Sequence, residues 1–133
     1  MMPSDPKTVV CVEDEPGVIE LIRLILDERG LKVVGAVTGT EGLALIRELQ
    51  PALVLLDLML PEMDGWEIFR RMKADEALKN IPIIIVTAKT AGIDEALAKY
   101  VAKVDAYIKK PFSLEELLQS VDRALGSAEE PSA

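Results

Sequence analysis

Short apolar runs alternate with longer amphipathic segments along most of the chain. Five of these runs predict strands over residues 8–12, 32–37, 53–56, 82–86 and 104–108. Apolar residues at helical spacing predict helices over residues 16–29, 40–49, 64–72, 94–102 and 113–125. This alternation is typical of repeated βα units around a parallel sheet, so the pattern predicts an α/β fold.

The ends and faces of these helices can also be predicted. Pro16 suits the first turn of a helix, while Gly30 and Gly126 are expected to end one. Leu24 falls outside the apolar face of its helix, so it is either merely exposed or part of a docking surface. Two residue pairs have the spacing of a capping box, Asp64 with Glu67 and Ser113 with Glu116. Three leucine and isoleucine residues of the second helix are expected to face inward, namely Leu43, Ile46 and Leu49.

Length and composition indicate one domain. The chain has 133 residues, of which half are apolar, and five βα units occupy nearly all of it. We expect one domain over residues 7–126, a disordered start over 1–6 and a flexible tail over 127–133. No segment is apolar enough to span a membrane or to act as a signal peptide. The single cysteine, Cys11, lies in an apolar run and predicts a buried thiol and a cytoplasmic location.

Charge and the absence of histidine narrow the possible functions. A net charge of -8 argues against direct nucleic-acid binding by general electrostatics. Without histidine, the chain cannot carry a phosphohistidine, a histidine metal ligand or a Ser-His-Asp triad.

Charged residues follow several of the predicted strands. Because carboxyl ends of parallel strands meet at one edge of the sheet, we expect one shared site there. Its candidate residues are Glu13, Asp14, Glu15, Asp57, Thr87, Lys109 and Lys110. Crowded carboxylates repel one another, and Mg²⁺ would relieve that repulsion through oxygen ligands. The alternative for Glu13 to Glu15 is an ordinary solvated acidic loop.

Asp57 is the candidate nucleophile, because an aspartate can attack phosphorus and form an acyl phosphate. A lysine after the fifth strand could hold a carboxylate or a phosphoryl oxygen, and the Thr87 hydroxyl could contact the phosphoryl group.

In order and spacing, these residues resemble the receiver domain of two-component response regulators, from about residue 7 to residue 125. The matching positions are Glu13-Asp14, Asp57, Pro61, Gly65, Thr87-Ala88, Tyr107 and Lys110-Pro111. The resemblance implies a flavodoxin-like, doubly wound (βα)5 fold with five parallel strands in the order 2-1-3-4-5.

The resemblance also implies a function. Asp57 would accept a phosphoryl group from a histidine kinase or a phosphotransfer protein, assisted by Lys110 and Thr87. Mg²⁺ would be bound by Asp14, Asp57 and the Met59 carbonyl, with Glu13 acting mostly through water. Thr87 and Tyr107 would then switch a face that binds an unknown downstream protein. Such a domain is a signalling phosphoacceptor rather than an enzyme, limited to self-phosphorylation and auto-dephosphorylation.

Some positions depart from the family pattern. Glu13 replaces the usual aspartate, and Lys103 stands where relatives often have glycine, which predicts altered capping of the fourth helix. Met59 and Lys89 flank the site where members of the family vary. We predict that the apolar Met59 side chain hinders the hydrolytic water and prolongs the phosphoryl group's lifetime; loss within seconds would contradict this.

Other functions fit less well. A nucleotide or flavin binder would need a phosphate-cradling loop where Glu13-Asp14-Glu15 stands, and an aspartate-dependent phosphatase would need an aspartate at Met59. A degenerate receiver that only binds proteins, independently of phosphorylation, remains the alternative. No output domain follows Leu125, so the sequence is either a stand-alone receiver, as in a phosphorelay, or a piece of a longer chain.

Overall fold

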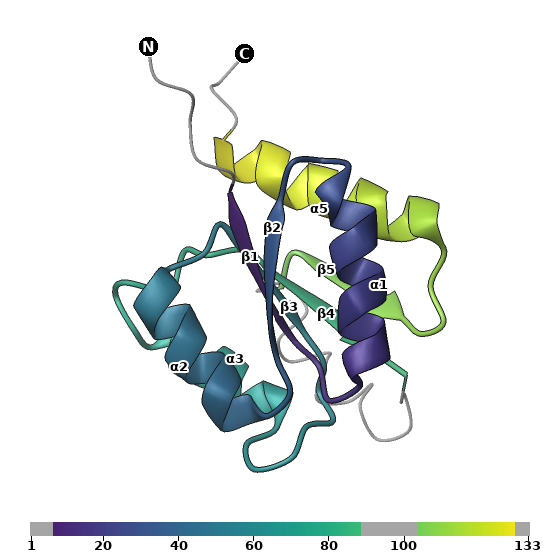
Figure 1. The fold of residues 1–133 in the computed structure, drawn as a ribbon. Helices are drawn as coiled ribbons and strands as arrows, with labels where there is room; N and C mark the ends of the chain where they lie inside the picture. Colours follow the sequence, from purple (N-terminus) through teal and green to yellow (C-terminus); the bar gives the residue numbers. More distant parts are fainter. Residues whose placement is uncertain (1–6, 89–103, 130–133) are drawn as a thin grey trace.

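The computed structural model contains a five-stranded parallel sheet with helices on both faces (Figure 1). It describes residues 7–88 and 104–126, and the backbone alone for 127–129. The strands are β1 (Thr8–Val12), β2 (Lys32–Ala36), β3 (Leu53–Leu56), β4 (Ile83–Thr87) and β5 (Ala106–Lys109). Their order is β2-β1-β3-β4-β5. The flavodoxin-like fold and the strand order implied by the resemblance are therefore confirmed.

Four helices lie in the described part of the chain: α1 (Pro16–Asp27), α2 (Gly39–Leu49), α3 (Gly65–Lys73) and α5 (Leu114–Glu129). The helix predicted over 94–102 and its altered capping at Lys103 fall outside the described residues, as does Lys89. One helix end was predicted wrongly, because α5 continues past Gly126 to Glu129. A glycine permits a helix to end but does not force it to, since helical backbone angles are open to it as well.

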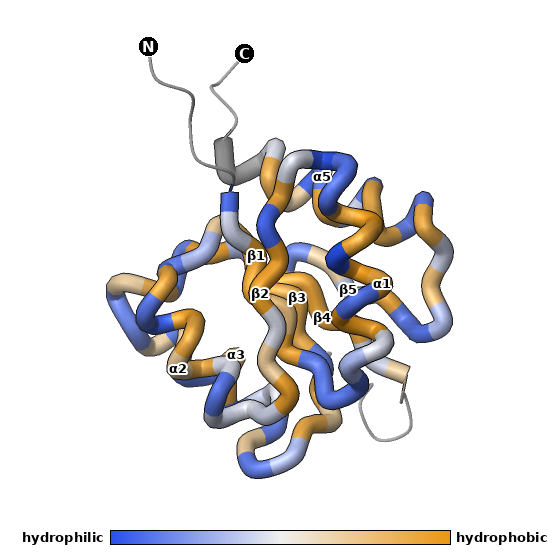
Figure 2. The backbone as a smooth tube through the Cα atoms, viewed as in Figure 1, coloured by the Kyte–Doolittle hydropathy of each residue, from blue (hydrophilic) through white to orange (hydrophobic). Residues whose placement is uncertain are grey.

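The sheet separates two apolar layers. α1 and α5 cover one face and α2 and α3 cover the other (Figure 1). Alternate residues of β1 divide between them: Val9 and Cys11 belong to the α1–α5 layer, and Val10 and Val12 to the α2–α3 layer. The central strands β1, β3 and β4 are thus buried on both sides, which explains their continuous apolar sequences (Figure 2).

Side-chain caps fix where α2 and α3 begin. The Thr38 hydroxyl accepts a hydrogen bond from the Glu41 N–H (3.1 Å), and the Glu41 carboxylate accepts one from the Val37 N–H (3.3 Å). The Thr38 cap was missed in the sequence, where the helix start was placed at Thr40. Asp64 caps α3 by accepting from the Glu67 N–H (3.0 Å).

Two expectations about side chains were only partly correct. The Glu67 carboxylate does not complete a capping box, because it pairs with Arg70 and Arg71 on its own helix. In α2, Leu43 and Ile46 are buried, but Leu49 is 39% exposed. Leu49 lies in the last turn, directly before Gln50 turns the chain with a left-handed φ of 44°.

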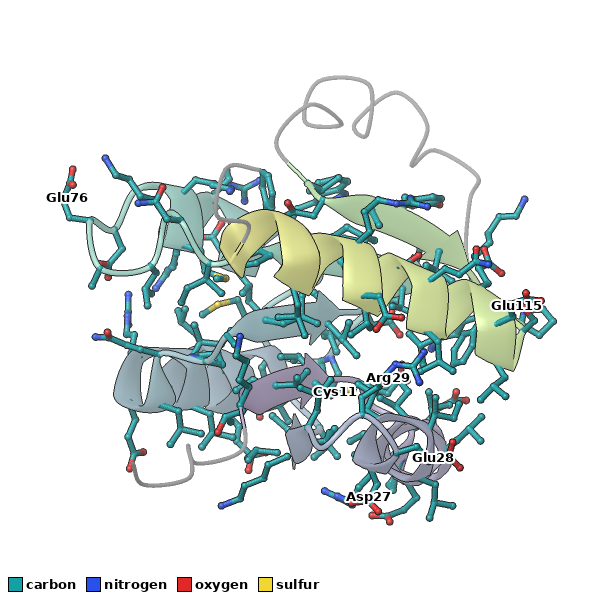
Figure 3. All side chains as sticks on the ribbon, turned by 90° about the horizontal axis from the view of Figure 1, so that it is seen from above. Cys11, Asp27, Glu28, Arg29, Glu76 and Glu115 are labelled. Atoms are coloured by element: carbon teal, nitrogen blue, oxygen red, sulfur yellow. The ribbon has the colours of Figure 1, made fainter. Side chains whose placement is uncertain are left out.

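A paired contact joins α1 to α5 at the far end of α1. The Arg29 guanidinium donates two hydrogen bonds of 3.0 Å to the Asp122 carboxylate, one to each oxygen. Figure 3 shows Arg29 at the end of α1, on the side that faces α5. This paired geometry raises the pKa of Arg29, chiefly through the hydrogen bond to Asp122. The contact ties the two helices of one layer together, on the opposite side of that layer from the carboxyl ends of the strands.

Candidate functional site at the carboxyl ends of the strands

Asp57 directly follows β3 and is held by the backbone on both sides. Its N–H donates to the Val12 carbonyl of the neighbouring strand (3.0 Å), which extends the sheet by one residue. Its carboxylate accepts from the Met59 N–H (3.0 Å). The residue is only 5% exposed. A buried carboxylate needs such donors or a cation to offset its lost hydration. The other carboxylate oxygen of Asp57 has Lys110 as its partner.

Gly65 allows the loop after Asp57 to close tightly. The Gly65 N–H donates to the Leu58 carbonyl (3.1 Å). A Cβ at position 65 would lie 2.4 Å from the Asp57 carbonyl oxygen and 2.8 Å from the Leu58 Cα. Both are backbone atoms that cannot move aside, so the position has room only for glycine. This contact explains in physical terms a residue that was noticed only through the resemblance.

Glu13 occupies the equivalent place after β1. Its N–H donates to the Ala36 carbonyl (2.9 Å), and its side chain points inward with 2% of the residue exposed. One carboxylate oxygen accepts from the Glu15 N–H (3.1 Å). The β1 loop therefore places a second buried carboxylate close to Asp57 and does not form a fully solvated acidic loop.

Lys110 lies between these carboxylates. Its ammonium nitrogen is 2.6 Å from Glu13 Oε1, 3.0 Å from Asp57 Oδ2 and 4.0 Å from Glu15 Oε1. Its N–H donates to the Thr87 carbonyl (3.0 Å), and the peptide bond to Pro111 is cis. Lys109, in contrast, is exposed at the end of β5. Of the two adjacent lysines, Lys110 is thus the one that reaches the site.

Burial and the neighbouring charges act in opposite directions on Lys110, and both act on Glu13. Burial raises the pKa of Glu13 to about 7; the Lys110 hydrogen bond opposes this shift and the nearby Asp57 carboxylate adds to it. Burial alone would lower the pKa of Lys110, but the hydrogen bonds to Glu13 and Asp57 outweigh it and raise that pKa. Lys110 is therefore a charged ammonium shared by two carboxylates.

Asp14 adds a third carboxylate at the exposed rim. Carboxylate oxygens of Glu13, Asp14 and Asp57 lie within 4.8 Å of one another. A set of three carboxylates with one shared ammonium leaves excess negative charge, which a divalent cation would offset. Clustered hard oxygen ligands that open to solvent on one side suit Mg²⁺, since it retains several of its waters. The residues present therefore fit a magnesium ion.

Thr87 and Tyr107 lie on neighbouring strands beside this cluster. Thr87 ends β4 and is fully buried, and its hydroxyl has no hydrogen-bond partner among the described residues. Tyr107 pairs with Ile85 in the β4–β5 register, and Thr87 is two residues further along β4. Thr87 and Tyr107 are therefore on the same face of the sheet. A buried hydroxyl without a partner costs free energy, so the Thr87 hydroxyl is available to a ligand at this site.

Comparison with known proteins agrees with the geometry. The chain matches the family model of the response regulator receiver domain over residues 9–122. It belongs to the receiver domain family. Receiver domains are signalling domains of two-component systems and not classical enzymes.

Two relatives illustrate the range of proteins that contain such a receiver domain. The polar-differentiation response regulator DivK of Brucella anthropi is 36% identical over 92% of this chain and 99% of its own length. The DNA-binding dual master transcriptional regulator RpaA of Synechocystis is 38% identical over 88% of this chain, but over only 48% of its own length. The chain thus spans about half of some curated relatives and nearly all of others.

Solved receiver structures have the same fold. A CheY-like receiver domain from Methanospirillum hungatei has a TM-score of 0.84 and 29% identity, covering 94% of this chain and 98% of its own. The receiver domain of the sensor histidine kinase PA1611 from Pseudomonas aeruginosa has a TM-score of 0.81 and 27% identity, covering 91% and 98%. The latter structure holds a magnesium ion in its active-site cleft. Among the helices described for the present domain, none is long and apolar enough to cross a membrane.

Proposed function

We propose that this receiver domain accepts a phosphoryl group on Asp57 from the phosphohistidine of a histidine kinase or a phosphotransfer protein. The observation that carries the proposal is the environment of the Asp57 carboxylate. One oxygen accepts from the Met59 N–H and the other from the Lys110 ammonium, at a buried position next to Glu13 and Asp14. These contacts hold the nucleophile in place and leave cationic and N–H donors ready for the phosphoryl oxygens.

Asp14 and Asp57 would hold Mg²⁺, together with the carbonyl of Met59, and Glu13 would act mostly through a bound water. The ion would neutralise charge on the phosphoryl oxygens during transfer. Lys110 already contacts Asp57, so its ammonium can follow the negative charge from the carboxylate to the phosphoryl group. The Thr87 hydroxyl would gain a phosphoryl oxygen as its partner.

Phosphorylation would then bias the domain between two states. A phosphoryl group adds roughly -1.5 to -2 charge at neutral pH. If the Thr87 hydroxyl moves toward that charge, it changes the space beside Tyr107 on the adjacent strand, and the ring can change its burial. This change would alter a surface that binds a downstream protein. We place this exchange in the cytoplasm, where a reduced Cys11 is stable.

The experiment is incubation of the purified protein with Mg²⁺ and a small phosphodonor, either acetyl phosphate or phosphoramidate, followed by intact-mass measurement. We expect a gain of one phosphoryl group in the native chain and in Asp27→Asn, whose exposed side chain is remote from the site. Asp57→Asn should gain none. If neither these donors nor a panel of histidine kinases phosphorylates the native chain, the domain is a phosphorylation-independent binding module instead.

A further inference from the structure

An open cleft of about 370 Å³ adjoins the phosphoacceptor site. Val18 and Leu21 of α1 and Phe112 after β5 give it mostly apolar walls, and its two charged residues are Lys110 and Glu15. Lys110 belongs both to this cleft and to the contacts of Asp57. The cleft therefore opens directly beside the place where the phosphoryl group is transferred.

The Glu15 carboxylate lies at the rim of this cleft. Its side chain is 66% exposed, and one oxygen is 4.0 Å from the Lys110 nitrogen. Lys110 lies much closer to Glu13 and Asp57, so its positive charge offsets the charge of those carboxylates more than that of Glu15. Of the three carboxylates near Lys110, Glu15 is therefore the one whose negative charge Lys110 offsets least. This charge lies at the entrance of the cleft. The Glu13–Asp14–Glu15 sequence showed the charge but not its distance from Lys110.

In-line transfer brings the leaving group toward this rim. The attacking oxygen of Asp57 and the leaving group lie on opposite sides of phosphorus. Because Asp57 is buried, the leaving group must depart toward solvent, and Glu15 and the apolar cleft lie on the solvent side of Lys110. The charge of the departing group therefore decides how Glu15 affects the reaction.

Two classes of phosphodonor differ in that charge. When Asp57 attacks phosphoramidate, the P–N bond breaks and its electron pair stays on the already protonated nitrogen, which leaves as neutral ammonia. A protonated phosphohistidine likewise releases neutral imidazole. When Asp57 attacks acetyl phosphate, the P–O bond breaks and acetate leaves as an anion. Acetyl phosphate also arrives as a dianion, whereas phosphoramidate arrives with one net negative charge.

We infer that Glu15 is a specificity-determining residue that favours phosphodonors with a P–N bond over acyl phosphates. The inference rests on the proposed phosphoacceptor function of Asp57 and identifies the class of donor that the site prefers. A carboxylate beside the leaving group repels departing acetate, but it does not oppose ammonia or imidazole. The apolar walls of Val18, Leu21 and Phe112 suit a neutral ring better than an anion.

The test compares phosphorylation rates with acetyl phosphate and with phosphoramidate at equal Mg²⁺ and ionic strength, followed by intact mass. In Glu15→Gln we expect the acetyl phosphate rate to rise about threefold at low salt and the phosphoramidate rate to change much less. Glu28→Gln, which removes the same charge from an exposed site at the end of α1, should leave both rates unchanged. In about 0.5 M salt the effect of Glu15→Gln should shrink, because the exposed charge is screened.

Each result has a distinct meaning. A fall in the preference for phosphoramidate in Glu15→Gln alone supports the inference. An equal change with both donors, or no change, overturns it, because Glu15 would then not distinguish leaving groups. If the native chain is phosphorylated on Asp57 but Glu15→Gln keeps the native preference between the two donors, only the proposed role of Glu15 is wrong. If neither donor nor a kinase phosphorylates Asp57, the proposed function fails first.

Discussion

At the scale of single residues, the Lys110 ammonium is the group on which the site depends most. It is 2.6 Å from Glu13 and 3.0 Å from Asp57, so one positive charge is shared by two carboxylates that are nearly inaccessible to water. The sequence alone could not choose between Lys109 and Lys110, because both follow the same strand. The choice came from the resemblance, and the structure gives its cause, since only Lys110 points into the pocket.

Replacing Lys110 should separate metal binding from phosphoryl transfer. In Lys110→Met we expect phosphorylation by phosphoramidate to fall about 100-fold, since a preorganised donor to the phosphoryl oxygens is lost. Mg²⁺ binding measured by calorimetry should persist or tighten, because the pocket becomes more negative. Lys109→Met is the control, and it should behave as the native chain does in both measurements. Equal losses in the two variants would contradict this role for Lys110.

The buried thiol of Cys11 gives a pH-dependent prediction. Burial raises the pKa of Cys11 from its ordinary value of 9.0 to about 12, and the residue is 1% exposed. Alkylation requires the thiolate, so iodoacetamide at pH 8 should label the thiol only after the protein is unfolded in urea. Because the folded state keeps this proton longer than the unfolded chain, its contribution to stability is complete below pH 9 and declines toward pH 12.

Mass spectrometry after timed labelling provides the measurement. The labelled fraction in native buffer should stay near zero while the urea sample reaches completion. A denaturation series above pH 9 should show a lower free energy of unfolding as pH rises. Rapid labelling of the native chain at pH 8 would show that the β1 region opens readily and would contradict the tight packing around Cys11.

At the scale of elements, the apolar pattern predicted the strands well because the three central strands, β1, β3 and β4, are covered on both faces. Helix ends were harder to predict. Thr38 caps α2, which begins at Gly39, one residue earlier than the apolar pattern alone suggested. Leu49 has the helical spacing of a core residue, but it lies in the last turn of α2 and is partly exposed. Periodicity shows which face is apolar, but not how far the neighbouring layer extends.

Two glycines on different elements should respond to alanine in opposite ways. In Gly65→Ala the new Cβ would meet the Asp57 and Leu58 backbone, so we expect a loss of about 1–3 kcal/mol in the free energy of unfolding. In Gly126→Ala nothing lies within 4 Å of the new Cβ, so a gain of about 0.5 kcal/mol is expected from the higher helix propensity. Urea denaturation measures both.

The same pair also tests the link between the loop and the site. Because Gly65 lies against the carbonyl of Asp57, Gly65→Ala should also slow phosphorylation, whereas Gly126→Ala should not. A stable Gly65→Ala protein that is phosphorylated at the native rate would show that the loop can relax without moving Asp57.

At the scale of the whole molecule, the parallel α/β architecture explains why the site could be predicted. Once five strands run in parallel, Glu13, Asp57, Thr87 and Lys110 must collect at one edge, whatever the strand order. The order β2-β1-β3-β4-β5 itself could not be deduced from periodicity and came from the resemblance. The approach of Glu15 to Lys110 could not be predicted either, because it depends on how the first loop turns after β1.

Magnesium should stabilise the whole domain, because the proposed cluster of Glu13, Asp14 and Asp57 exists only when the ends of β1 and β3 are assembled. At about one hundred times its dissociation constant, a ligand that binds only the folded state adds about 2.7 kcal/mol. For a domain of this size, that should raise the thermal midpoint by roughly 10 °C. Thermal unfolding with and without Mg²⁺ at constant ionic strength measures the shift.

Asp14→Asn distinguishes a specific ion from general screening of a chain with net charge -8. Without Mg²⁺, this variant should be at least as stable as the native domain, since one of three mutually repelling carboxylates is gone. With Mg²⁺, its thermal shift should be much smaller, while Asp27→Asn should keep the native shift despite the same loss of charge. Equal shifts in all three proteins would mean that Mg²⁺ acts on the total charge and not through the cluster of Glu13, Asp14 and Asp57.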